Sequence, residues 1–164
     1  MLIGLLSDTH DNLPAVQRAL DAFAERGVEA LFHAGDFVAP FVLKVLLRAE
    51  LPITGVFGNN DGARRSLSKL CDDLHPAPHT FRMAGRDIVL THDPETLTPD
   101  LLAGKDLAIC GHIHEPDVTG ASPLVVNPGE VGGWVTGRCT AAVLDLDRME
   151  VELIELGEQE TVPI

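Results

Sequence analysis

Five short polar motifs recur along the chain, and each directly follows an apolar segment. They are Asp8-Thr9-His10, Gly35-Asp36, Gly58-Asn59-Asn60-Asp61, Thr91-His92 and Gly111-His112-Ile113-His114. Their candidate ligands are two carboxylates, an amide oxygen and four imidazoles, a mixed set that suits first-row divalent metal ions. The motifs therefore predict a metal site. Its expected ligands, called the metal cage below, are Asp8, His10, Asp36, Asn59, His92, His112 and His114.

The spacing inside these motifs also suits a shared centre. Asp-x-His and His-x-His place both side chains on the same side of an extended segment, so both can point at one ion. Glycines 35, 58 and 111 are expected to let the backbone turn sharply at angles that other residues resist. Taken singly, each motif is more simply a turn or a structural histidine. Five of them in order, each after an expected strand, favour the metal site.

Strand-loop-helix units position the first three motifs. Apolar runs precede each motif, and apolar residues at helical spacing follow it. The expected strands are residues 2–6, 30–32 and 53–57, and the expected helical segments are 13–26, ended by Gly27, 41–47 and 64–74. Three such units in a row predict a parallel sheet with helices on its faces, whose carboxyl-terminal edge gathers the motifs.

The second half of the chain favours further strands. They are expected at residues 80–83 and 87–91, joined as a hairpin, and at 107–110, 124–126, 140–146 and 149–156. The last two flank Asp147-Arg148 and form an expected antiparallel pair, with apolar residues alternating at Val151 and Leu153 and Leu156 as a further candidate. The predicted fold class is α/β, with two facing mixed β-sheets forming a sandwich flanked by helices. We expect residues 1–164 to form a single domain.

The composition limits the classes of partner. Twelve Lys and Arg against 25 Asp and Glu give a formal charge of −13, which disfavours a nucleic-acid platform or binding to an anionic membrane. An anionic substrate then needs a local positive centre, which metal ions could supply. Three widely spaced cysteines argue against a disulfide framework. Without a signal peptide or a membrane-spanning run, we expect a cytoplasmic protein.

In order and type, the five motifs resemble those of the calcineurin-like metallophosphoesterase superfamily, over about residues 1–130. The short chain resembles the small prokaryotic single-domain phosphodiesterases of that family. The resemblance implies a four-layer α/β/β/α fold and a metal-dependent phosphodiesterase in which a metal-bound hydroxide attacks phosphorus. It implies two divalent ions, with Mn²⁺ expected and Ni²⁺, Fe²⁺, Co²⁺ or Zn²⁺ also open.

The same resemblance implies a role for each residue. Asp8, His10 and His114 would hold one ion, Asn59, His92 and His112 the other, and Asp36 would bridge them. The residues expected to take part in catalysis are Asp36, Asn59, Asp61 and His10. Asp61 is expected to hydrogen-bond around the site without touching metal.

Three positions depart from the family pattern. Asn60 stands where larger phosphatases carry a histidine, and an amide cannot act as a general acid, so esters with good leaving groups are expected. Asp93 follows His92 in place of glycine and is either a second-shell group or, as we favour, a turn starter. Glu130 follows Asn127-Pro128-Gly129 in place of serine. If Glu130 points into the pocket, its carboxylate would disfavour highly charged substrates. The alternative is that Glu130 faces solvent.

Residues outside the cage have open interpretations. Asn60 and Arg64 are candidate substrate-binding residues, although a solvent-facing Arg64 is the commoner outcome. His33 is either a hydrogen-bonding partner of a ligand or a satisfied core histidine. Trp134 either covers a binding surface or oligomer contact or, as we favour, is partly buried, and His75 and His79 are assigned no role.

Two other functions compete with the phosphodiesterase. One is a phosphomonoesterase or nucleotide phosphohydrolase acting on a small phosphate ester. The other is a catalytically weak scaffold, as in the eukaryotic retromer subunit that resembles this family. The presence of all seven ligands favours an enzyme. The sequence leaves a homo-oligomer open.

Overall fold

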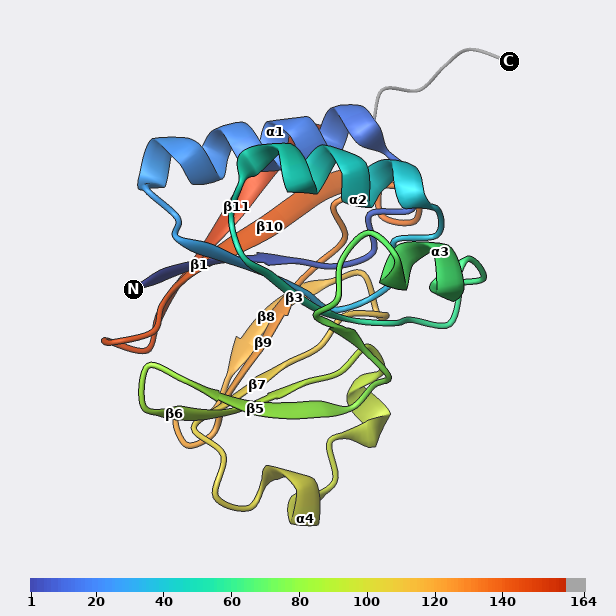
Figure 1. The fold of residues 1–164 in the computed structure, drawn as a ribbon. Coiled ribbons are helices and arrows are strands. Elements are labelled where there is room, and N and C mark those ends of the chain that lie inside the picture. Colours follow the sequence, from blue (N-terminus) through green and yellow to red (C-terminus); the bar gives the residue numbers. More distant parts are fainter. Residues whose placement is uncertain (159–164) are drawn as a thin grey trace.

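Two β-sheets pack face to face in the computed structural model, which describes residues 1–158 (Figure 1). Helices α1 and α2 cover the outer face of the first sheet, and α4 lies beyond the second. One apolar core fills the space between the helices and the first sheet, and a second fills the space between the sheets. The predicted α/β sandwich is confirmed, although its fourth layer is thin, formed by the one-turn helices η2 (Pro94–Thr96) and α4 (Pro99–Leu102).

The first sheet has the strand order β11-β10-β1-β2-β3-β4. Its strands are β1 (Leu2–Leu6), β2 (Ala30–His33), β3 (Ile53–Val56), β4 (Leu74–His75), β10 (Arg138–Asp145) and β11 (Glu150–Glu158). Strands β1 to β4 are parallel, as predicted for the strand-loop-helix units, and β10 and β11 extend the sheet antiparallel. Both faces of the central strands are buried, which explains their continuous apolar runs.

Helix α1 (Leu13–Arg26) begins and ends at residues suited to those positions. The Asn12 side chain accepts a hydrogen bond from the Ala15 amide, and Gly27 ends the helix with a left-handed φ of 69°. Helix α2 (Pro40–Leu46) continues into the short helix η1 (Leu47–Ala49). Both helices lie close to the predicted segments.

Helix α3 (Arg64–Ser68) is much shorter than the predicted 64–74 segment. Leu67 is its one buried residue, so little apolar surface holds a longer helix in place. The chain instead turns and places Leu74 in β4, where its side chain packs over Gly55 of β3. The prediction was wrong because pairing with β3 overrides the local helical pattern.

The second sheet has the strand order β5-β6-β7-β9-β8. Its strands are β5 (His79–Met83), β6 (Arg86–Leu90), β7 (Leu107–Ile109), β8 (Pro116–Thr119) and β9 (Leu124–Pro128). Strands β6, β7 and β9 are parallel, and the predicted hairpin of β5 and β6 is confirmed. Edge strand β8 was missed because its residues are mostly exposed and lack an apolar pattern.

The antiparallel pair of β10 and β11 is confirmed. Of its three predicted apolar residues, Leu156 is buried and Val151 packs partly buried against the core between the sheets, but the prediction for Leu153 is wrong. Ile154 and Leu156 are buried in the core below the helices. Leu153 lies on the opposite face of this edge strand and is 44% exposed. Among residues 1–158, no helix has the length and apolar character needed to span a membrane.

Gly4 in β1 gives a test of how tightly α1 packs on the first sheet. A Cβ at this position would lie 2.8 Å from the Phe23 ring and 2.9 Å from Leu31. We expect Gly4→Ala to lower the free energy of unfolding by about 1–3 kcal/mol through overpacking, measured by urea denaturation. Gly62→Ala is the matched control, because a Cβ there meets no atom within 4 Å. Equal stability of the two variants would contradict the packing argument.

Candidate metal centre

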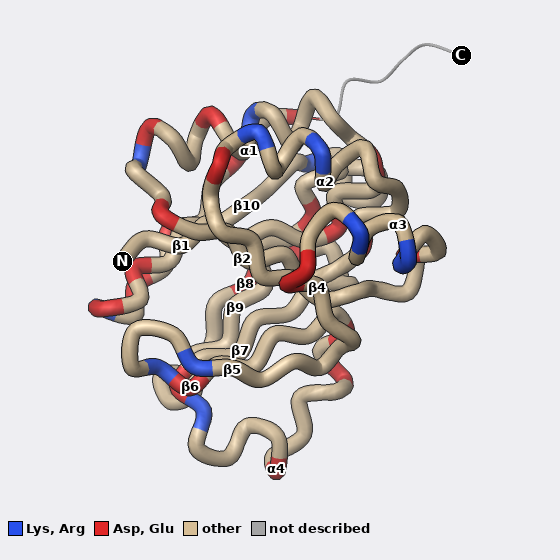
Figure 2. Tube along the Cα trace, in the orientation of Figure 1, with Lys and Arg blue, Asp and Glu red and all other residues tan. Residues whose placement is uncertain are grey.

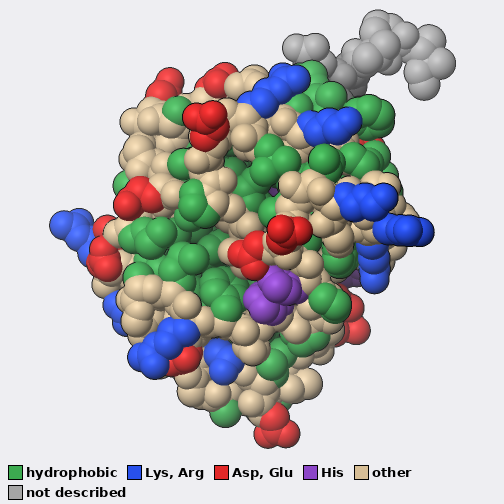
Figure 3. All heavy atoms as spheres, in the orientation of Figure 1, with side chains coloured by type: hydrophobic (Ala, Val, Ile, Leu, Met, Phe, Trp, Pro, Cys, Tyr) green, Lys and Arg blue, Asp and Glu red, His purple; other side chains and the backbone are tan. Residues whose placement is uncertain are grey.

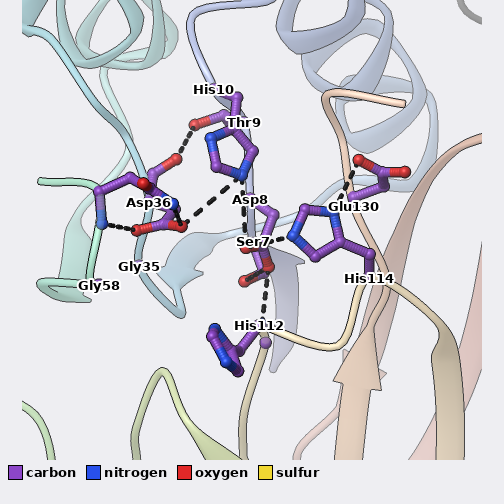
Figure 4. A network of polar contacts seen from close by, with 12 residues as sticks. Ser7, Asp8, Thr9, His10, Gly35, Asp36, Gly58, His112, His114 and Glu130 are labelled. Atoms are coloured by element: carbon purple, nitrogen blue, oxygen red, sulfur yellow. Dashed lines mark hydrogen bonds and ion pairs between the residues drawn. The ribbon is translucent and has the colours of Figure 1, made fainter. Parts of the chain in front are cut away.

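All five polar motifs lie at the carboxyl ends of strands. Figure 4 shows residues from the loops after β1, β2, β3 and β7 close together at one edge of the sandwich. The first sheet contributes the loops after β1, β2 and β3, and the second contributes those after β6 and β7. The structure thereby brings the seven residues of the metal cage together, as two groups of three with Asp36 between them.

The first group consists of Asp8, His10 and His114. Oδ1 of Asp8 lies 3.7 Å from Nε2 of His10 and 3.4 Å from Nε2 of His114. Within residues 1–158, Asp8 Oδ1 and His10 Nε2 are among the few buried polar atoms without a hydrogen-bond partner. Buried polar atoms are rarely left in this state, and a cation between them would satisfy both. The donor set therefore fits a divalent metal ion.

The second group consists of Asn59, His92 and His112. Nδ1 of His92 lies 2.8 Å from the Ala34 carbonyl oxygen, to which it donates its proton. This leaves the lone pair of His92 Nε2 facing Asn59 Oδ1 at 2.8 Å and His112 Nδ1 at 3.2 Å. A backbone carbonyl that fixes the tautomer of a ligating histidine is a common feature of metal sites.

Asp36 lies between the two groups. Its Oδ2 atom is 3.6 Å from His10 Nε2 and 3.5 Å from His92 Nε2. Asn60 holds the carboxylate from one side, with its backbone N–H 2.8 Å from Oδ1 and its side-chain amide 2.7 Å from Oδ2. The oxygen can therefore face two ions at once.

The backbone of the ligand loops is not extended, which corrects the expectation drawn from Asp-x-His and His-x-His. Positive φ angles occur at Asp8 (51°), His10 (40°), Asp36 (60°), His112 (70°) and His114 (63°). Such angles are uncommon outside glycine and concentrate at functional sites, at about 1–3 kcal/mol each. The side chains converge because of these turns and not because of strand alternation.

Two of the three glycines also act differently from the prediction. Gly35 has a positive φ of 100°, as expected, but Gly58 and Gly111 do not. They are needed for close approach, since a Cβ would lie 2.2 Å from Asp36 Oδ1 at Gly58 and 1.8 Å from Ser7 Oγ at Gly111. Any side chain at these two positions would displace the residues around the ligands.

Comparison with known proteins identifies the family. The calcineurin-like phosphoesterase superfamily domain matches residues 1–149. The chain belongs to this superfamily. It is 35% identical over 165 residues to a phosphodiesterase of Methanocaldococcus jannaschii, covering 95% of this chain and 99% of that protein. The expected phosphoric ester hydrolase is thereby confirmed at the level of the family.

Solved structures agree with this assignment. The structure of an archaeal phosphodiesterase matches with a TM-score of 0.86 and 32% identity, covering 94% of this chain and 99% of that one. A phosphoesterase from E. coli, named Yfce, matches with a TM-score of 0.71 and 22% identity, covering 96% of this chain and all of that one. At that identity the second match shows the fold alone.

Asp61 of this phosphoesterase supports the site from behind. Its carboxylate accepts hydrogen bonds from the backbone N–H groups of Asp36, Val38 and Gly58, at 3.0, 2.7 and 2.8 Å. Burial raises the pKa of this carboxyl. The hydrogen bonding around the site was predicted, and both carboxylate oxygens of Asp61 accept hydrogen bonds from the backbone. A catalytic role for Asp61 stays a prediction.

Glu130 is neither solvated nor open to substrate. It is fully buried, and its Oε2 lies 2.8 Å from Nδ1 of His114, which directs His114 Nε2 toward Asp8. The backbone N–H and hydroxyl of Thr136 hold Oε1 at 2.6 and 2.7 Å. Burial raises the pKa of Glu130, but these hydrogen bonds outweigh it and lower the pKa. In the sequence, position 130 stood out because Glu130 replaces the serine of the family pattern. No sequence feature indicated that His114 would be its partner.

His33 is the satisfied core histidine of the two alternatives. Burial lowers its pKa to about 3, so the ring is neutral. Nδ1 accepts from the Gly35 N–H at 3.2 Å, and Nε2 lies 3.1 Å from the Thr9 hydroxyl. The ring therefore ties the loop after β1 to the loop after β2 without contacting a cage side chain.

Three further residues beside the cage are now placed. Arg64 donates to the Gly58 and Asp61 carbonyl oxygens at 2.9 and 3.0 Å, so its guanidinium braces the loop that carries Asn59. Asp93 accepts from the Glu95 N–H and starts η2, as the turn interpretation predicted. Trp134 is 57% exposed and donates to the His10 carbonyl oxygen at 3.1 Å.

The contact between Glu130 and His114 gives a test of the first ligand group. We expect Glu130→Gln to weaken Mn²⁺ binding by about 10- to 100-fold, because the partner that orients His114 loses its charge. Isothermal titration calorimetry with Mn²⁺ measures the change in affinity. Glu115→Gln is the matched control, since Glu115 follows His114 in sequence but is exposed. Equal affinity of the two variants would contradict the role of Glu130.

Proposed function

We propose that this phosphoesterase is a phosphodiesterase that hydrolyses small phosphate esters with two divalent ions held by the metal cage. Asp8, His10 and His114 would hold one ion, Asn59, His92 and His112 the other, and Asp36 would contact both. The position of Asp36 Oδ2, 3.6 Å from His10 Nε2 and 3.5 Å from His92 Nε2, carries the proposal. When bound, two such ions would lower the pKa of water and neutralise charge on the phosphoryl oxygens.

The charge of the chain supports this arrangement. The formal net charge is −13, and the basic residues are spread over α1, α2, α3, the β5–β6 hairpin and further segments without forming one patch (Figure 2). Burial alone would raise the pKa of Asp8, but the neighbouring His10 and the Ser7 hydroxyl outweigh it, so the pKa lies below its usual value. The carboxylate is therefore ionised and able to bind a cation. Two divalent ions carry more positive charge than Asp8 and Asp36 remove. The cage would then attract an anionic ester into an acidic protein.

Oxygen and imidazole donors accept several first-row ions. We propose that the cage binds Mn²⁺, with Fe²⁺, Co²⁺, Ni²⁺ and Zn²⁺ as the alternatives. The ligand set itself supports this range, because it contains no thiolate that would select softer ions. A zinc, iron, cobalt or nickel form would use the same seven residues.

The residues beside the cage support an ester with a good leaving group. A pocket of about 300 Å³ opens beside Asn59, His92 and His112, with Arg64 in its wall. Arg64 has N–H groups beyond the two that bind the backbone, and these would contact a phosphate oxygen. Asn60, which holds Asp36, has no proton to give as a general acid. Exposed Trp134 and Ile113 lie next to cage residues and would contact an apolar part of the ester.

Removal and return of metal tests the proposed activity. We expect exhaustive chelation to abolish hydrolysis of bis(4-nitrophenyl) phosphate and Mn²⁺ to restore it, with the diester hydrolysed faster than 4-nitrophenyl phosphate. Asp36→Asn, which keeps the size of the side chain but not its charge, should remain inactive with Mn²⁺. Activity that survives chelation would overturn the metal mechanism. A faster monoester would favour the phosphomonoesterase, and no turnover with any of the five metals would favour the scaffold.

The leaving-group preference has its own test at position 60. Asn60→His introduces a general acid, so we expect faster hydrolysis of alkyl diesters, by up to the about 10²- to 10⁴-fold that such catalysis contributes, with little change for aryl diesters. Asn60→Gln is the control, because it keeps the amide. Steady-state rates on both ester classes measure the effect. Equal rates of the histidine and glutamine variants on alkyl esters would show that position 60 does not govern the leaving group.

A further inference from the structure

A second group of metal-binding side chains lies outside the cage. Asp73, His75 and His79 bring one donor atom each within 4.8 Å of one another. Asp73 is exposed and the two histidines are half-buried. Figure 3 shows histidine side chains beside acidic side chains on one face of the molecule, and acidic residues mark the chain at β4 in Figure 2.

The three residues come from both sheets. Asp73 and His75 lie at β4, the edge strand of the first sheet, whereas His79 begins β5, the edge strand of the second. Only Pro76, Ala77 and Pro78 separate the two histidines. An ion bound here would therefore join the edges of the two sheets.

Existing contacts bring the donor atoms close together. Thr54 donates to Asp73 Oδ2 at 2.6 Å, which leaves Oδ1 facing His75 Nε2 at 2.6 Å. The rings of His75 and His79 stack with centroids 3.6 Å apart and planes 7° apart. Donors at zinc bond lengths of about 2.0–2.2 Å are roughly 3.4 Å apart in a tetrahedron, so Asp73 Oδ1 and His75 Nε2 would move apart on binding. The stacked rings of His75 and His79 would also turn, so that both nitrogen lone pairs point at the ion.

The donor chemistry selects the ion. Two imidazoles and one carboxylate suit Zn²⁺ and its first-row neighbours, whereas Ca²⁺ and Mg²⁺ prefer all-oxygen sites. Three protein ligands leave a fourth position for water. We propose that Asp73, His75 and His79 bind one Zn²⁺ ion that clamps β4 to β5.

The clamp has a consequence for the pocket beside the cage. Pro76 and Ala77, which lie between the two histidines, line that pocket together with Asn59, His92 and His112. An ion at the clamp would fix this part of the pocket wall. The site shares no residue with the cage, so it stands whether or not the proposed phosphodiesterase activity is correct.

Zinc binding by the full chain tests the clamp. Metal-free protein is equilibrated with Zn²⁺ alone, and bound zinc per chain is counted by mass spectrometry of the separated protein. We expect Asp73→Asn and the double variant His75→Gln, His79→Gln to bind one Zn²⁺ fewer per chain than the wild type. Asp72→Asn is the matched control, because this neighbouring exposed carboxylate lies outside the group. Loss of a ligand should weaken Zn²⁺ binding by more than the about 10- to 100-fold seen when a group that only orients a ligand is changed.

Repeating the count in an Asp36→Asn background separates the clamp from the cage. Zinc at the clamp should remain there and disappear when His75 and His79 are changed. Equal zinc counts in the site variants and in Asp72→Asn would overturn the site. Zn²⁺ should also raise the melting temperature of the Asp36→Asn protein by more than that of its clamp variants. An equal rise in both would overturn the clamping role, and equal metal-free melting temperatures across the set verify folding.

Discussion

The carboxylate of Asp36 is the group on which the rest of the site depends. It is almost fully buried, both of its oxygens accept hydrogen bonds from Asn60, and one oxygen faces histidines from two separate loops. A buried carboxylate among imidazoles is stable only when its charge is compensated. Every neighbouring feature, from the support by Asp61 to the absence of a side chain at Gly58, keeps this carboxylate at the meeting point of the two ligand groups.

Holding that point requires backbone conformations that the chain would otherwise avoid. Left-handed angles at five cage residues are unfavourable by themselves, so the surrounding structure must stabilise them. The stabilisation comes from two apolar cores below the loops and from polar side chains that bind the loop backbone. Asp61 binds three amides, and His33 connects two loops while remaining neutral in the core. Folding and the geometry of the candidate metal site are thus coupled through the same loops.

The alignment of the two sheets also affects the geometry of the cage. The cage draws ligands from both sheets, so its geometry depends on how the sheets are aligned. The segment from β4 to β5 is a direct covalent link between the sheets, and it also lines the pocket beside Asn59 and His92. The group formed by Asp73, His75 and His79 lies at this link. The short segment from β4 to β5 therefore connects the two sheets, forms part of the pocket wall and lies at the group of Asp73, His75 and His79.

Local patterns of apolar and polar residues predicted the candidate ligands, their order and the strand-loop-helix units that carry them. They also indicated the two sheets and the closing pair β10–β11. In contrast, the end of α3 at Ser68, the pairing of Leu74 in the sheet and the exposure of Leu153 are set by tertiary packing. The same holds for the partner of Glu130 and for the meeting of His75 with His79. These features depend on which strand edges and loops pack together, and such long-range contacts leave no periodic signal in the chain.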